Sequence, residues 1–184
     1  MRSRRPSPRR FWRDQRGASA VEFALIAPVL ILMYCGMAEL TQAMMAQRRV
    51  SNITSSIGDL TAQASQTGPA RTTDVFNIGA IIMTPFPTTG LKMCVASITS
   101  DATGKDTVAW SRASASGMST CPAQGTVLTV PVGVLPASQS VIMARASYAY
   151  ASPIKLVMPR NITFQRTFYL RPRKVDTVIW SASS

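Results

Sequence analysis

The sequence predicts an α+β protein in which one long N-terminal helix packs against a small antiparallel β domain. Two observations support this fold class. An apolar stretch at residues 21–40 is followed by a polar stretch that keeps apolar residues at helical spacing, and the rest of the chain contains short alternating apolar segments. Intervals of three and four residues indicate a helix face, whereas strict alternation indicates a strand. A helix followed by a run of strands favours an α+β architecture.

The first half of the predicted helix is expected to cross a membrane. Residues 23–38 carry no charge, and residues 18–40 together supply the roughly 20 residues that a transmembrane helix needs. Glu22 and Glu39 are the only charged residues in this stretch. No second hydrophobic run approaches its length, so we predict one span.

Beyond the span, residues 41–68 are predicted to continue as an amphipathic helical stalk. Apolar residues recur there every three or four positions, which marks one face of a helix. The dipeptide Gly68-Pro69 is expected to end the helix. The stripe consists of Ala46, Val50, Ile53, Ile57, Leu60 and Ala64.

Residues 69–184 are predicted to form a β-rich domain. From about residue 72, serine, threonine, glycine and proline become frequent and the apolar runs become short. Residues 162–170 alternate most regularly, with Phe164 and Leu170 on one face and Tyr169 on the other. The candidate strands are 91–98, 107–112, 126–134, 141–150 and 162–170.

Three cysteines are present, and two of them lie in the β-rich domain. An oxidising compartment would allow Cys94 and Cys121 to form a disulfide, which would stabilise the domain by roughly 3–4 kcal/mol in the chain-entropy model. Cys35 lies in the predicted span. The chain has no CxxC motif and no histidine, so neither a metal site nor a cofactor is expected.

The charge distribution predicts the orientation in the membrane. The formal net charge is +12, and seven arginines lie in a leader formed by residues 1–17. Basic residues beside a hydrophobic span stay in the cytosol, so we expect a cytosolic N-terminus and a C-terminal domain on the far side. Such a run can also bind nucleic acid, but its position directly before the apolar stretch favours the role in topology, and no nucleic-acid partner is expected.

The composition argues against an enzyme. Without histidine the chain lacks the commonest general base and the commonest zinc ligand. The acidic residues after the span show no paired-carboxylate pattern, and the many serines include no Gly-x-Ser-x-Gly turn.

The segment most informative about function is residues 16–23, Arg-Gly-Ala-Ser-Ala-Val-Glu-Phe, where a carboxylate follows small residues just inside the apolar helix. A charge inside a membrane span is costly and is therefore a candidate functional group. The segment resembles the processing motif of type IV pilin-like proteins. More narrowly, it is similar to the N-terminus of the TadE family, which are minor pilins or pseudopilins of the tight-adherence (Tad/Flp) pilus. Tyr148-Ala149-Tyr150 and Arg171-Pro172-Arg173 are weaker points of similarity.

This resemblance implies a structural role in pilus assembly. A prepilin peptidase would cut after Gly17 and make Ala18 the mature N-terminus. The Glu22 carboxylate would then pair with the N-terminal amine of a neighbouring subunit, although Ala18 and Glu22 lie one helical turn apart and pairing within one chain stays open. Phe23 stands where major pilins of this class usually carry tyrosine, which fits a minor component.

The partners implied by the resemblance are the peptidase, other pilin or pseudopilin subunits, an inner-membrane pilus assembly platform and the lipid bilayer. The implied location is the bacterial inner membrane, with the C-terminal domain in the periplasm.

Three alternatives remain open at the level of the sequence. The chain could be an uncleaved, membrane-anchored scaffold protein of an envelope pilus or secretion machine. It could be secreted after cleavage at Ala38, which follows a small residue two positions earlier. It could also be an anchored binding module whose basic outer domain contacts acidic surfaces or DNA.

Overall fold

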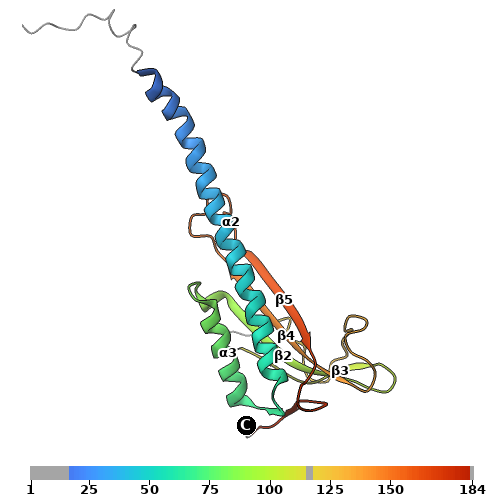
Figure 1. Cartoon of the computed structure of the whole chain (residues 1–184). Helices are drawn as coiled ribbons and strands as arrows, with labels where there is room; N and C mark the ends of the chain where they lie inside the picture. Colours follow the sequence, from blue (N-terminus) through green and yellow to red (C-terminus); the bar gives the residue numbers. More distant parts are fainter. Residues whose placement is uncertain (1–16, 115–117, 183–184) are drawn as a thin grey trace, which may run out of the picture.

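The computed structural model describes residues 17–114 and 118–182. The leader predicted at residues 1–17 lies outside this description except for Gly17. The predicted α+β fold is confirmed: helix α2, Ala18–Ala62, packs on a four-stranded antiparallel sheet. Figure 1 shows the first half of α2 projecting from the head of the molecule, while its second half lies along the sheet.

The second half of α2 buries the apolar stripe that the spacing predicted. Ala46, Val50, Ile53 and Ile57 have no solvent exposure. They contribute to a core shared with two strands of the sheet, β2 (Leu91–Ser100) and β4 (Ser140–Tyr150), and this core holds the helix against the sheet. Because burial of one aliphatic side chain stabilises a fold by about 1.5–3 kcal/mol, these contacts hold the second half of α2 firmly on the sheet.

Four strands form the sheet in the order β3-β2-β4-β5, with every neighbouring pair antiparallel. Their bounds are Leu91–Ser100 for β2, Asp106–Ala113 for β3, Ser140–Tyr150 for β4 and Ile162–Leu170 for β5. In β5, Phe164 and Leu170 pack on the helix side and Tyr169 on the other side, as the alternation predicted.

Close approach between α2 and the sheet depends on Gly58. A Cβ atom added there would lie 2.6 Å from Leu170 Cδ1 and 2.9 Å from the Ala144 Cβ atom. Any side chain at this position would push the helix away from β4 and β5. The close packing that glycine allows at this position therefore outweighs its poor helix propensity.

The expectation that the helix runs to Gly68-Pro69 is wrong. Helix α2 ends at Ala62, and Gly68-Pro69 instead begins a second helix, α3, Pro69–Met83. Proline suits the first turn of a helix because that turn has no partner for its N–H group. Between the two helices, β1, Gln66–Thr67, pairs in parallel with β6, Ile179–Trp180.

The sequence did not predict helix α3 because β-branched residues and a glycine weaken its apolar periodicity. Its buried face consists of Thr72, Val75, Gly79 and Met83, which recur at intervals of three and four residues. Together α2 and α3 cover one face of the sheet (Figure 1). A short 3-10 helix, Thr88–Gly90, then leads into β2.

The candidate strand at 126–134 is also wrong. Residues of this segment make one isolated bridge, between Val127 and Thr107. Pro131 has no N–H group to donate to a ladder, and Gly133 adopts a φ of +85°, so the segment cannot extend as a strand. It belongs to the long β3–β4 connection, which covers the sheet face opposite the helices with Met118, Leu128, Val130, Val134 and Leu135.

The C-terminal segment docks on the head. Val178 is fully buried, and its carbonyl oxygen accepts a 2.7 Å hydrogen bond from Trp110 Nε1. Arg112 lies 4.0 Å above the ring of Trp180. Nearby, Arg173 forms a 2.6 Å salt bridge with Asp59 at the end of α2.

Candidate functional site: the projecting helix and its attachment

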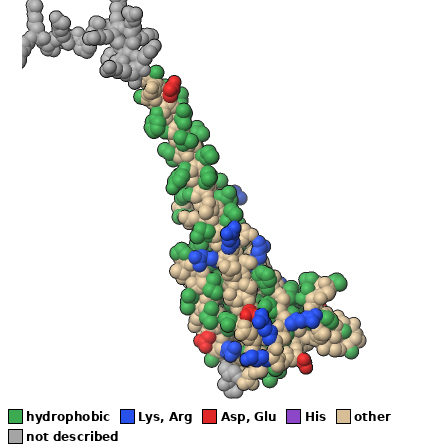
Figure 2. Space-filling view, viewed as in Figure 1, with side chains coloured by type: hydrophobic (Ala, Val, Ile, Leu, Met, Phe, Trp, Pro, Cys, Tyr) green, Lys and Arg blue, Asp and Glu red, His purple; other side chains and the backbone are tan. Residues whose placement is uncertain are grey.

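The projecting half of α2 presents apolar side chains to its surroundings. Phe23 and Leu25 are each 71% exposed, and Tyr34 is 75% exposed. Over its most apolar window none of the helix is buried by the rest of the protein. By length and composition it is the one helix in the described part of the chain that could cross a membrane (Figure 2). A surface this apolar needs a lipid or protein partner.

The predicted processing and assembly residues lie together at the free end of this helix. Gly17 is the N-cap, and among the described residues no side chain or distant backbone atom lies within 4 Å of the position that a Cβ atom would take on it. Ala18 begins the helix, and Glu22 follows one turn later. Both are exposed, as is Phe23. Residues 17–23 are therefore exposed in the described part of the chain. Cleavage or ion pairing at these residues does not require a conformational change in the head.

Glu39 has a structural role that the sequence analysis did not assign. Its side chain is fully buried at the end of the apolar stretch. Its Oε1 accepts a hydrogen bond from the Leu156 N–H at 2.6 Å, and its Oε2 accepts bonds from Val157 at 2.9 Å and Met158 at 2.8 Å. The three donors belong to the β4–β5 loop, residues 151–161, so one carboxylate fastens this loop to α2.

Two further features favour this attachment. Gly36 leaves room for the loop, since a Cβ atom added there would lie 3.2 Å from Val157 Cγ2. Lys155 adopts a φ of +57°, which bends the backbone just before the three donors. The sequence carries a signal for this site: an acidic residue near the end of a membrane-length apolar helix requires a partner. The identity of that partner could not be read from the sequence because it lies 117–119 residues away.

The Tyr148-Ala149-Tyr150 segment belongs to the core. Both tyrosine rings make edge contacts with Phe86, with ring centroids 6.5 and 6.1 Å apart. Burial raises the pKa of both Tyr148 and Tyr150, so both phenols stay neutral at physiological pH. These residues anchor the segment between α3 and β2 against β4.

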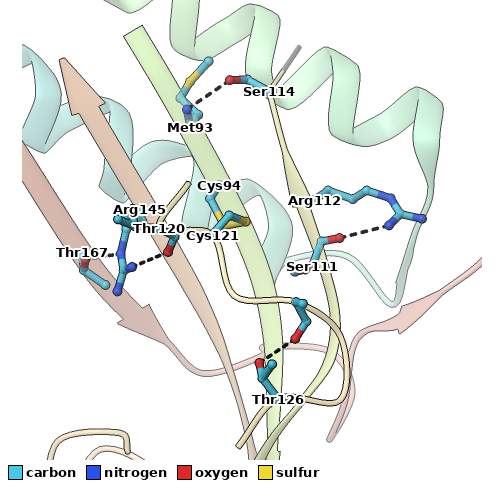
Figure 3. Close-up of a disulfide and its surroundings, with 11 residues drawn as sticks. Met93, Cys94, Ser111, Arg112, Ser114, Thr120, Cys121, Thr126, Arg145 and Thr167 are labelled. Carbon is cyan, nitrogen blue, oxygen red and sulfur yellow. Dashed lines mark hydrogen bonds between the residues drawn. A yellow bond between two sulfur atoms is a disulfide. The ribbon is translucent and has the colours of Figure 1, made fainter. Parts of the chain in front are cut away.

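Cys94 and Cys121 are joined by a disulfide, with Cα atoms 5.7 Å apart. Cys94 lies on β2 and faces the side opposite the helices, so the bond ties the β3–β4 connection to the sheet. Figure 3 shows a second attachment close by, where Arg145 Nη1 donates to the Thr120 carbonyl at 2.6 Å and Nε donates to Thr167 Oγ1 at 3.0 Å. Cys35 is the free cysteine of the described chain.

The disulfide leads to a prediction about thiol reactivity. In protein purified without reductant and then denatured, a maleimide should label Cys35 and leave Cys94 and Cys121 unmodified. After reduction, all three should react, and the loss of the cross-link should destabilise the head by roughly 3–4 kcal/mol. Mass spectrometry of the labelled peptides measures the first effect. Labelling of Cys94 or Cys121 before reduction would rule out the bond in the native protein.

The exposed apolar half of α2 and its second half, which packs on an antiparallel sheet, define a class of protein with a projecting apolar N-terminal helix and an α+β head. Residues 17–57 match the model of the family described as TadE-like protein. The match covers the projecting half of α2 and most of the half that packs on the sheet; the β strands lie beyond it. It implies a pilin-like protein associated with the Tad pilus. Neither the curated proteins nor the solved structures contain a match to this chain.

Proposed function

We propose that this protein is a TadE-like pseudopilin or minor pilin that acts structurally in the assembly of a Tad/Flp-type pilus. The observation that supports it most is the projecting helix: Gly17, Ala18 and Glu22 lie at its free end, inside the segment that matches the family model. In this proposal a prepilin peptidase cuts after Gly17, and the exposed apolar half of α2 holds the subunit in the bilayer until assembly.

The proposed orientation places the leader in the cytosol and the head in the periplasm, with the helix crossing the bacterial inner membrane. The disulfide supports this orientation, because disulfides persist in oxidising compartments such as the periplasm. The proposed partners are the peptidase, other pilin or pseudopilin subunits and the inner-membrane assembly platform. A structural role, and not a catalytic one, fits the family.

Cleavage tests the proposal directly. Mass spectrometry of protein from the native host should find a mature chain that begins at Ala18. Gly17→Val should block this cleavage, because the peptidase must approach the backbone at the scissile bond. The substitution should leave the head unchanged, since the position of the Cβ atom is open.

Ala24→Val is the matched control, since it places the same side chain at an exposed position within the helix that Gly17 caps, and it should be processed normally. A mature chain that retains the leader in the native host would contradict processing and favour the alternative, an uncleaved anchored scaffold protein.

A further inference from the structure

We infer that the β4–β5 loop is a membrane-surface contact, in which its apolar side chains enter the outer boundary of the bilayer that α2 crosses. This inference rests on the proposed membrane anchoring and adds a second contact with the same lipid. Three properties of the loop support the inference: its position along α2, its exposed apolar side chains and its positive charge.

The depth of the loop is fixed by Glu39. From Ala18 to Glu39 the helix advances about 32 Å, at about 1.5 Å per residue, which matches the roughly 30 Å hydrocarbon thickness of a bilayer. The Glu39 carboxylate binds the N–H groups of residues 156–158, so the loop lies where the span ends. Figure 1 shows the connection between β4 and β5 beside α2, at the end of the sheet nearest the projecting half of the helix.

The loop exposes apolar side chains at this level. Ile154 is 43% exposed, Leu156 is 47% exposed and Val157 is 58% exposed. The neighbouring part of the helix is also apolar and exposed: Met37 is 60% exposed, Leu40 is 53% exposed, and the Val157 side chain lies against Gly36. Exposed apolar side chains held against a membrane-length helix indicate contact with the same apolar medium.

The charge of the loop fits lipid headgroups. Residues 151–161 include two basic residues, Lys155 and Arg160, and no acidic residue. Both basic side chains are exposed. The nearby carboxylate of Glu39 is buried and occupied by the loop backbone. Long basic side chains beside inserted apolar residues reach back to anionic headgroups, and each adds to the attraction.

The consequence is a head that is fixed relative to the bilayer. A single helix would let the head tilt and rotate, whereas a second contact held rigidly to α2 restricts both motions. Withdrawal of the subunit from the membrane would then require the loop to leave the lipid together with the helix.

Depth-dependent fluorescence quenching tests the inference on the full-length protein. In a Cys35→Ser background, Val157→Cys, Val132→Cys and Leu30→Cys would each be labelled with an environment-sensitive fluorophore. The variants would be reconstituted in phosphatidylethanolamine–phosphatidylglycerol vesicles that contain lipid with a quencher on the acyl chain. Val132, which is fully exposed on the β3–β4 connection, reports an aqueous position, and Leu30 reports the span.

We expect several-fold stronger quenching at position 157 than at position 132, together with strong quenching at position 30. Equal, weak quenching at positions 157 and 132 with strong quenching at position 30 would overturn the loop contact but leave the anchor intact. Weak quenching at position 30 would overturn the anchoring itself, and with it the proposed function. A probe at position 157 that is shielded from water but not quenched by lipid would identify a protein neighbour and also overturn the inference.

A charge reversal provides an independent measurement. Lys155→Glu with Arg160→Glu should reduce quenching at position 157 several-fold in vesicles that contain phosphatidylglycerol, and should do so less in neutral phosphatidylcholine vesicles. Neither side chain contributes to the Glu39 attachment. An unchanged signal in both kinds of vesicle would remove the proposed role of headgroup attraction.

Discussion

Replacement of Glu39 by alanine should release the β4–β5 loop from α2. The substitution removes the acceptor of three backbone N–H groups, those of Leu156, Val157 and Met158. A hydrogen bond to a charged group contributes about 1.5–3 kcal/mol, and water can satisfy part of what is lost. We therefore expect loop opening to become about 10- to 100-fold more frequent, since about 1.4 kcal/mol corresponds to a factor of ten.

Limited trypsin digestion in detergent measures this opening. Lys155 and Arg160 lie within the loop, while the next basic residues on either side, Arg145 and Arg166, lie on β4 and β5. Glu39→Ala should accelerate cleavage after Lys155 and Arg160 specifically. Glu39→Gln should have an intermediate effect, because the amide keeps one acceptor oxygen but brings an NH₂ group toward the same donors.

Glu22→Ala is the control for Glu39→Ala, since it removes the other carboxylate of the apolar stretch from an exposed site. Cleavage of the loop should not change in this variant. If Glu39→Ala is cut no faster than Glu22→Ala, the carboxylate does not hold the loop, and the fixed depth on which the lipid contact depends is lost.

The features that could be read from the sequence are those set by local periodicity. The stripe from Ala46 to Ile57 identifies the buried face of α2 because a helix repeats every 3.6 residues. The alternation at 162–170 matches β5, Ile162–Leu170. In both elements the residues that define the pattern are close in the chain, so the tertiary fold selects a conformation that the local sequence already favours.

The features that the sequence did not predict depend on contacts between residues far apart in the chain, or on residues that are compatible with two different structures. Gly68-Pro69 can end a helix or begin one, and only the packing of Val75 and Met83 on the sheet decides between them. The partners of Glu39 could not be predicted because they follow β4, far along the chain. The strand expected at 126–134 shows the converse, since its apolar residues cover a sheet face while the segment forms one isolated bridge, between Val127 and Thr107.

The remaining prediction is that Glu22→Ala abolishes piliation without affecting folding or processing. Glu22 is exposed on the projecting half of α2, far from the core of the head. Its loss should leave the unfolding free energy of the head unchanged and should make membrane insertion slightly more favourable, because a charge leaves the apolar segment. Cleavage should continue, since it depends chiefly on Gly17.

What the variant should lose is the counter-charge for an incoming subunit. In the proposed assembly, the amine of Ala18 enters an apolar environment beside Glu22 of a neighbour, and a buried charge left without its partner costs about 3–5 kcal/mol. That cost corresponds to a loss in subunit affinity of about two to four orders of magnitude. Glu22→Gln keeps the shape of the side chain but not its charge, so it should fail as well, whereas Ala24→Val should assemble.

The measurement is pilus formation alongside the mature N-terminus of the same strains. Pairing within one chain predicts a different result, because the amine of an unassembled subunit would then be protected from modification in the wild type and more reactive in Glu22→Gln. If the amine is equally reactive in both unassembled proteins and piliation is lost only in the variant, the carboxylate acts between subunits. If both Glu22 variants are cleaved and form normal pili, Glu22 serves only the start of the helix, and the assembly role proposed for it is wrong.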